Sequence, residues 1–264
     1  MSVTVLLLGI GADATNCEPS PRVYPDERFD YIPIPEKNGP DGTTESVTYG
    51  TWPISGDRTA ADYLQAIRPT PNGSRQTGAA LTEWPVHHDP NFQALTYGET
   101  SSRAAYVNAI RRLDPGDIVA STPAWSAESR YRHRYLIGWF TVDHVLDCQA
   151  VSWEGTCVQL SDLPPDEQTR IMQAHETNAH AKRFLETGEL RASEDGLVIV
   201  EGRQPGGLLE RAIKLSDRRS GGHYYLTQEL IDALEPVKAD PYLGGIKQVH
   251  TLQADRAFLD LIGA

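Results

Sequence analysis

The chain has 264 residues, of which 39% are hydrophobic and 23% are charged, so it has enough apolar residues for a sizeable core in one or two domains. No apolar run approaches the roughly 18 residues of a transmembrane helix, which excludes a membrane-spanning protein. The opening apolar run lacks the basic segment of a signal peptide. We therefore expect a cytoplasmic protein that forms a single domain over residues 1–264.

The charge balance is strongly acidic. The 36 aspartates and glutamates outnumber the 24 lysines and arginines, which gives a net charge of −12, and only 5 of the bases are lysines. An acidic, lysine-poor surface stays hydrated in concentrated salt, where screening removes the repulsion between carboxylates. The composition therefore predicts a halophilic protein. Because salt also weakens phosphate contacts, a nucleic-acid-binding protein of this kind depends on base stacking and hydrogen bonds.

Two sequence patterns argue against a bound zinc ion and a bound dinucleotide. The cysteines, Cys17, Cys148 and Cys157, are odd in number and form no CxxC pair, which disfavours a zinc ribbon or a disulfide framework. The early Gly9-Ile-Gly11 turn lacks the third glycine and the following helix of a dinucleotide-binding loop. We expect neither a metal nor a cofactor.

Hydrophobic periodicity and turn residues predict the first half of the chain in order. The expected elements are a buried strand over residues 3–10, a proline-limited edge strand over 29–35, a short helix over 59–67, an exposed loop over 68–80, a helix over 101–113 and a strand over 118–121.

The second half continues with a long strand over 135–146, in which Gly138 marks a bulge or a close approach. The later expectations are a helix over 165–187 ended by Gly188, a strand over 196–201, a loop over 202–207, and helices over 208–215, 226–235 and 252–262. Strands and helices do not alternate regularly, which favours an α+β fold with a mixed or mainly antiparallel sheet.

A first resemblance lies in the middle of the chain. Gly116-Asp117 leads into a strand and a loop, and Ile137-Gly-Trp-Phe-Thr-Val142 follows as a second strand. This arrangement resembles the PUA-like superfamily, which includes the EVE and ASCH domains. The resemblance implies a β-barrel core at about residues 87–201 with peripheral helices. It also implies a pocket for a flipped or modified base, with Trp125 and Trp139 as candidate walls. The alternative is a hairpin of an unrelated sheet in which Trp139 is simply buried.

A second resemblance covers residues 3–220. Its signals are the opening strand, Pro19-Ser20-Pro21, Ile32-Pro-Ile-Pro-Glu36, His87-His88-Asp89-Pro90, Gly116-Asp117, and Gly207-Leu-Leu-Glu-Arg-Ala212. Together they resemble the nucleotide modification associated domain family, the third of its series. The resemblance implies a role in making, reading or removing modified bases in phages and their hosts. The implied partner is DNA or a nucleotide that carries a modified base.

The residue types themselves suggest chemistry at two places. His87, His88 and Asp89 precede a proline, and such a cluster suits part of a metal site, a general acid–base pair or an ordinary turn. For an enzyme we assign the catalytic roles to His88, Asp89 and His175. On the predicted helix, His175 and His180 are five residues apart, so their rings diverge by roughly 140° and should not share a metal.

Further residues suit contacts with a base or a phosphate. Asn178 shares a helix face with His175, and Arg183 shares one with His180, so Asn178 and His180 are candidates for contacts with base edges. Arg130, Arg132 and Arg134 alternate with aromatic residues, which suits phosphate or guanine contacts and stacking, or else ion pairs with the acidic surface. Arg203, Gly206 and Gly207 precede a predicted helix and suit an anion.

The leading hypothesis is recognition or processing of modified bases or nucleotides in a DNA-modification or restriction system. The alternative is a hydrolase or base-modifying transferase that uses the histidine and aspartate residues. The two differ in whether the turn at His87–Asp89 and the helix with His175–His180 meet at one cleft.

The composition makes a prediction about salt. If dissolved ions screen the repulsion between the acidic residues, thermal unfolding should occur at a higher temperature in molar KCl than in dilute buffer. Differential scanning calorimetry over a KCl series measures this. A melting temperature that salt leaves unchanged or lowers would contradict the halophilic interpretation.

Overall fold

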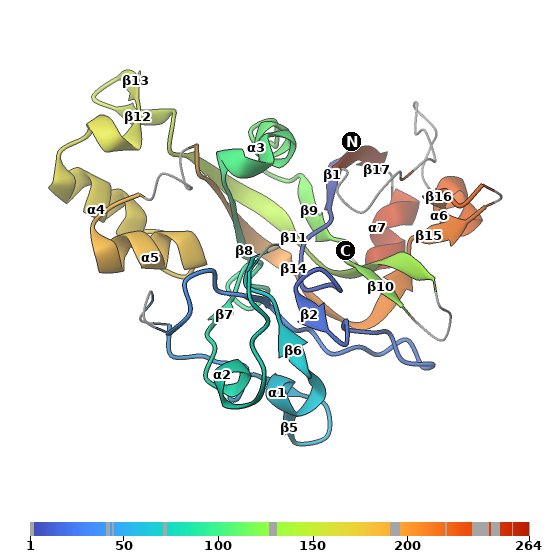
Figure 1. The fold of residues 1–264 in the computed structure, drawn as a ribbon. Coiled ribbons are helices and arrows are strands. Elements are labelled where there is room, and N and C mark those ends of the chain that lie inside the picture. Colours follow the sequence, from blue (N-terminus) through green and yellow to red (C-terminus); the bar gives the residue numbers. More distant parts are fainter. Residues whose placement is uncertain are drawn as a thin grey trace.

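The structure is a computed structural model that describes residues 3–40, 43, 45–70, 73–126, 131–190, 196–219, 221–233, 243, 249–254 and 256–263. Its centre is a seven-stranded sheet in the order β17-β1-β9-β11-β14-β8, with β10 paired to β11 (Figure 1). These strands are β1 (Val3–Leu8), β8 (Thr96–Glu99), β9 (Ile118–Ser121), β10 (Ala124–Ser126), β11 (Arg132–Asp147), β14 (Val198–Lys214) and β17 (His250–Ala254).

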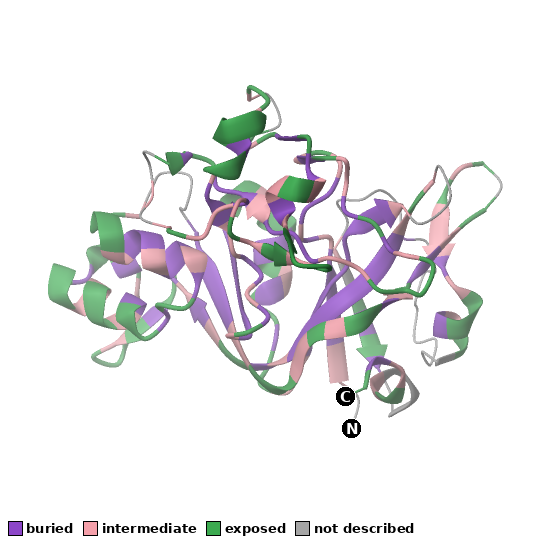
Figure 2. Cartoon of the chain, turned by 90° about the horizontal axis from the view of Figure 1, so that it is seen from below, coloured by how far each residue is buried: buried purple, intermediate pink, exposed green. Residues whose placement is uncertain are grey.

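The sheet is mixed. β1 pairs in parallel with β9, and the other neighbours pair antiparallel. Two long strands, β11 with 16 residues and β14 with 17, run through the centre of the molecule (Figure 1). Figure 2 shows buried segments along the long strands and exposed surface on the outer helices. The α+β class and the mixed sheet predicted from the sequence are confirmed.

Alternating side chains divide the core into two layers, because successive residues of a strand point to opposite faces. Val5 and Leu7 of β1 belong to one hydrophobic cluster, which Leu230 and Ile262 of two C-terminal helices cover. The opposite face of the sheet buries side chains from β1, β9 and β11 under the helix that contains Tyr106 and Ile110. Its cluster includes Leu6, Leu8, Val119, Phe140, Tyr106 and Ile110.

Small elements surround the sheet. The two-stranded pairs are β2 (Cys17–Glu18) with β6 (Ala66–Ile67), β3 (Ile34–Pro35) with β7 (Val86–His87), β4 (Pro53–Ile54) with β5 (Arg58–Thr59), β12 (Val151–Trp153) with β13 (Thr156–Val158), and β15 (Ser216–Arg218) with β16 (Tyr224–Leu226). The helices are α1 (Ala60–Tyr63), α2 (Gly78–Thr82), η2 (Ser101–Arg103), α3 (Ala104–Ile110), η3 (Leu160–Asp162), α4 (Pro165–Gln173), α5 (Ala179–Thr187), α6 (Gln228–Ala233) and α7 (Arg256–Ile262).

The helix predicted over residues 165–187 is two helices, α4 and α5. The Asn178 side chain accepts a hydrogen bond from the backbone N–H of His180 at 3.0 Å and so caps the start of α5. Gly188 ends α5 in a left-handed conformation with φ 72°, as predicted. His175 therefore lies in the turn between two helices, and the helical angle between His175 and His180 does not apply.

The helix predicted over residues 208–215 is wrong, and so is the loop over 202–207. Residues 202–214 are part of β14, which pairs with β11 from Tyr135 to Asp147. Pairing across the sheet outweighs the helical propensity of the Leu-Leu-Glu-Arg-Ala sequence. Gly206 permits this pairing, because a Cβ there would lie 2.7 Å from the Cα of Phe140. The helix start on which the predicted anion site depended is therefore a strand.

Gly138 is a point of close approach, as predicted. A Cβ at this position would lie 2.5 Å from the ring of Phe92, and the register of β11 shifts between Leu136 and Gly138. The described strands form an open sheet, and no closed barrel is found among them, so the PUA-like barrel stays a prediction. Within the described ranges, no helix is long and apolar enough to cross a bilayer.

The buried indole of Trp139 provides a test of the sheet. It is 3% exposed and donates a hydrogen bond to the carbonyl of Ile262 at 3.1 Å, which ties β11 to α7. Trp139→Ala should lower the free energy of unfolding by about 3–5 kcal/mol. Leu208→Ala, at a side chain that is 44% exposed, is the control and should have little effect. Urea denaturation measures both, and equal small losses would contradict this packing.

Candidate functional site

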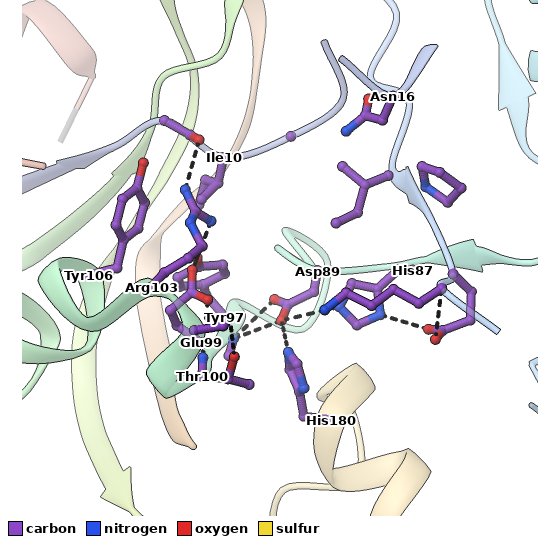
Figure 3. A pocket seen from close by; sticks show the side chains of 18 of the residues that line it. Ile10, Asn16, His87, Asp89, Tyr97, Glu99, Thr100, Arg103, Tyr106 and His180 are labelled. Carbon is purple, nitrogen blue, oxygen red and sulfur yellow. Dashed lines mark hydrogen bonds and ion pairs between the residues drawn. The ribbon is translucent and has the colours of Figure 1, made fainter. Parts of the chain in front are cut away.

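A pocket of about 690 Å³ opens beside the edge strand β8 (Figure 3). Its walls come from the turn after β1, the β3–β7 pair, β8, the start of α3, and α5. The volume lies in the range of small-molecule sites. Segments from the first, second and last thirds of the chain thus meet at one cavity.

Asp89 lies at the centre of this site. Its carboxylate accepts hydrogen bonds from the backbone N–H of Gly98 at 2.9 and 3.1 Å, which fix the turn after β7 against β8. Gly98 is required for this approach. A Cβ on residue 98 would lie 2.5 Å from Cδ2 of His180 and 3.2 Å from Oδ2 of Asp89.

His87 ends β7, two residues before Asp89. Its Nδ1 lies 3.0 Å from Oε2 of Glu36, which follows β3. An ionised carboxylate only accepts, so Nδ1 donates to Glu36. In the neutral ring, Nε2 then carries the lone pair, and it lies 4.0 Å from Oδ2 of Asp89. Glu36 therefore fixes both the tautomer and the direction of His87.

His180 enters from the first turn of α5. Its Nε2 lies 3.4 Å from Oδ2 of Asp89, and its Nδ1 lies 2.9 Å from Nη2 of Arg183, one turn further along the helix. Arg183 also donates from Nη1 to Oε1 of Glu36 at 3.1 Å. Arg183 thus joins the supports of the two histidines, because it contacts Glu36 on one side and His180 on the other.

Burial shifts the pKa values of the ionisable side chains in this site. Desolvation raises the pKa of Asp89 well above its usual range, although the Gly98 hydrogen bonds oppose this. Desolvation also lowers the pKa of His180 well below its usual value, so this ring is neutral at pH 7. For Glu36, burial raises the pKa, but the hydrogen bond from His87 and the charges of His87 and Arg183 outweigh it, so the pKa lies well below normal.

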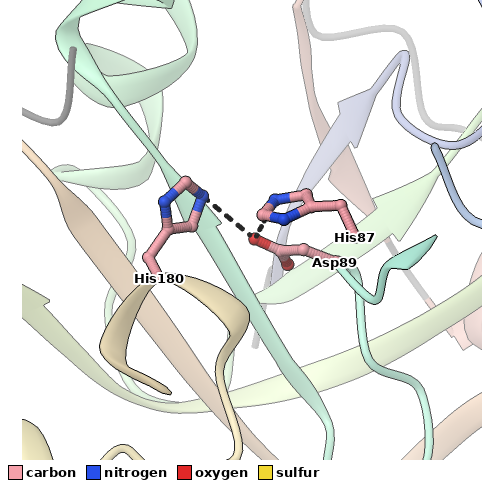
Figure 4. A group of neighbouring side chains, drawn as sticks. All are labelled: His87, Asp89 and His180. Carbon is pink, nitrogen blue, oxygen red and sulfur yellow. Dashed lines mark ion pairs between the residues drawn. The ribbon is translucent and has the colours of Figure 1, made fainter. Parts of the chain in front are cut away.

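His87, Asp89 and His180 form a compact group (Figure 4). Each offers one ligand atom, and the three atoms lie within 4.8 Å of one another. Both rings face the same carboxylate oxygen, with an angle of 83° between their planes. Two imidazoles and a carboxylate in this arrangement can transfer protons or hold a metal ion.

The opposite wall carries a second polar group, visible in Figure 3. Glu99 accepts hydrogen bonds from the hydroxyl of Tyr97 at 2.5 Å and from Arg103 at 2.8 Å. Arg103 lies over the ring of Tyr106 at 3.5 Å and donates to the carbonyl of Gly9 at 3.3 Å. These contacts hold a guanidinium and an aromatic ring across the cavity from Asp89.

Of the three residues assigned catalytic roles from the sequence, only Asp89 lines the pocket. His88 points away and packs against Trp52 with ring centroids 4.8 Å apart, and burial lowers its pKa to about 4. Nδ1 of His175 lies 2.6 Å from Glu201, and the His175 ring stacks on that of His144.

The residues predicted to contact a base are also divided. His180 lines the pocket, and Asn178 is buried next to it, where it caps α5 and donates to Thr96. Trp125 and Trp139 lie in the core with 0% and 3% exposure, and both indoles donate to backbone carbonyls. Neither tryptophan lines the pocket, because the hydrophobic clusters bury both rings.

The described members of the predicted basic set, Arg132, Arg134 and Arg203, do not line the pocket. Arg130 falls outside the described residues. Arg132 is exposed on β11, whereas Arg134 is buried, and desolvation lowers its pKa. Arg203 is exposed beside Asp143 at 3.7 Å. Gly206 and Gly207 lie inside β14.

The sequence analysis named His87 and Arg183 only as members of wider groups, without a role of their own, and it did not include Glu36. One signal was present: in an extended segment, residues two apart face the same side. His87 and Asp89 therefore point together, and His88 points the other way. Nothing in the sequence shows that Glu36 meets His87, because that contact depends on the pairing of β3 with β7.

The fold and site define a mixed-sheet protein with a buried two-histidine, one-carboxylate group in a pocket. Residues 4–230 match the model of the family nucleotide modification associated domain 3, and the chain belongs to this family. No match is found among the curated proteins or among the solved structures. The family name links the chain to nucleotide modification.

Gly98 provides a test of the site geometry. Gly98→Ala places a methyl group against His180 and Asp89, so it should lower the free energy of unfolding by about 1–3 kcal/mol and displace the His180 ring. Gly98→Val should cost more. Urea denaturation and the imidazole NMR signals of His180 measure the two effects. A Gly98→Val chain with wild-type stability and an unchanged His180 signal would contradict the contact.

Proposed function

We propose that the chain is an enzyme that processes a modified base or its nucleotide in a DNA-modification or restriction system, with the pocket beside β8 as the active site. The observation that carries this proposal is the convergence of His87, Asp89 and His180 on one point of the pocket. The family relationship supplies the substrate class.

The geometry favours processing over simple recognition. A protein that only binds a base needs a stacking wall and fixed hydrogen-bond partners. Two orientable imidazoles around a buried carboxylate are costly to bury and add nothing to stacking. Their cost is understandable if they move protons or hold an ion. Trp125 and Trp139, the stacking walls that a reader would use, are in the core.

The pocket also suits the parts of a nucleotide. Lys37 and Arg68 line it and are exposed, so they are available to a phosphate group. With a phosphate at the basic residues, the base or sugar would extend toward the group formed by His87, Asp89 and His180.

The test is turnover of a defined substrate panel. The full chain, with divalent metal salts present, is incubated with unmodified and modified deoxynucleoside monophosphates, free and within DNA, and products are identified by mass spectrometry. His87→Gln should reduce the rate by about 100-fold or more, because it removes one of the three groups that converge in the pocket, whether that group accepts a proton or binds an ion. Substrate affinity should stay within a few fold.

His88→Gln is the matched control, since its ring faces Trp52 outside the pocket. It should keep wild-type turnover. A loss in His88→Gln equal to that in His87→Gln would contradict the assignment. Binding of a modified nucleotide without any product from the panel would favour recognition instead.

A further inference from the structure

We propose that His87, Asp89 and His180 bind one divalent first-row transition-metal ion at the floor of the pocket. The ligands are Nε2 of both imidazoles and a carboxylate oxygen of Asp89. The inference deepens the proposed function and rests on it for the role of the ion in chemistry, whereas binding of the ion can be measured without any nucleotide.

The distances suit one shared ion. Oδ2 of Asp89 lies 3.4 Å from Nε2 of His180 and 4.0 Å from Nε2 of His87. Metal bonds of about 2.0–2.2 Å place neighbouring ligand atoms about 3–3.5 Å apart. Binding of one ion requires the three ligand atoms, which lie within 4.8 Å of one another, to move closer together. The two rings approach the carboxylate from nearly perpendicular planes, and Nε2 of each ring faces the same carboxylate oxygen (Figure 4).

His87 and Asp89 are held in place by contacts that are typical of metal-binding residues. Metal-binding histidines commonly donate their other ring N–H to a carboxylate, which fixes the tautomer. His87 does this through Nδ1 and Glu36, 3.0 Å away. Asp89 is held by the backbone N–H of Gly98, and this contact leaves its carboxylate facing both imidazoles.

Charge gives a second, independent argument. The side chain of Asp89 is 2% exposed, and among the described residues no lysine or arginine forms an ion pair with it. Burial is costly for the charged form of a carboxyl group, and the Gly98 hydrogen bonds and the charge of Arg183, which lies beyond ion-pair distance, offset only part of this cost. A divalent ion at this point supplies a direct ion pair. Two nitrogen ligands and one oxygen suit Fe²⁺, Mn²⁺, Co²⁺ or Zn²⁺ better than Mg²⁺ or Ca²⁺, which prefer oxygen.

Binding of the ion by His180 requires a change of its tautomer. Its Nδ1 lies 2.9 Å from Nη2 of Arg183, and a guanidinium can only donate, so Nδ1 accepts and the proton of the neutral ring is on Nε2. An ion on Nε2 requires that the proton move to Nδ1. Ion binding therefore opens the contact between Arg183 and His180, while Nη1 of Arg183 keeps its bond to Glu36.

The remaining coordination positions face the pocket. Three protein ligands leave at least one position for water or a substrate atom, as in catalytic rather than structural sites. An ion there supplies Lewis-acid activation of a bound water or substrate oxygen.

The test begins with the full chain stripped by a chelator and titrated with Co²⁺, followed by its visible absorption and by calorimetry. We expect one ion per chain and a raised melting temperature. His87→Gln, Asp89→Asn and His180→Gln should each weaken binding at least tenfold, and thermal melts identify any variant that fails to fold. His88→Gln and His175→Gln are matched controls that should bind like the wild type.

A second measurement follows the ring nitrogens by ¹⁵N NMR with Zn²⁺ added. The signals of His87 and His180 should report metal on Nε2 and a proton on Nδ1, while those of His88 and His175 stay unchanged. This readout keeps the inference testable if a variant unfolds.

The outcomes separate this inference from the proposed function. A stripped chain that binds no stoichiometric ion, or folded His87→Gln and His180→Gln chains that bind like the wild type, would overturn the metal site. Turnover of a nucleotide by the chelated chain would also overturn it and keep the proposed function. A chain that binds the ion but converts nothing in the panel supports the site and contradicts the proposed function.

Discussion

The contact between the Asp89 carboxylate and the backbone N–H of Gly98 is the constraint on which the site depends. It attaches the turn after β7 to an edge strand of the main sheet, whose backbone is held by pairing with β14. The first turn of α5 packs on the same strand, so the missing side chain of Gly98 leaves room for His180 and Asp89 together. The rigid sheet therefore sets the distance between histidines that lie far apart in the chain.

The polar side chains around Asp89 form a connected network, in which each side chain holds the next one in place. Arg183 joins Glu36 to His180, and Glu36 orients His87. Removing one member leaves a buried charge or an unpaired donor, which costs more than the single contact contributes. Such a network has one favourable arrangement, so it orients the imidazoles at the expense of stability. This trade is typical of functional sites.

Part of the sheet was predictable from the sequence, because a continuous apolar run is a local signal of a buried strand. The apolar runs gave β1, β9 and β11, and the helix over residues 101–113 is present as η2 and α3. The strand over residues 208–214 was missed because its helical propensity is local and its pairing with β11 is not. The candidate site was likewise predictable only where its signal was local. The cluster at His87–Asp89 was visible, but the choice of His88 ignored the alternation of side chains, and the partners Glu36 and Arg183 come from distant segments.

The charge of the pocket bears on how an anionic nucleotide reaches it. The chain carries a net charge of −12, yet the pocket lining holds four carboxylates and four basic side chains. The excess of negative charge therefore lies outside the pocket and repels a phosphate at long range. At physiological ionic strength the screening length is only about 8 Å, and it shortens further in concentrated salt. Salt thus removes the long-range repulsion more effectively than it weakens hydrogen bonds and ligand bonds inside the cavity. Under the proposed function, recognition of a nucleotide would therefore depend on short-range contacts inside the pocket rather than on electrostatic attraction from a distance.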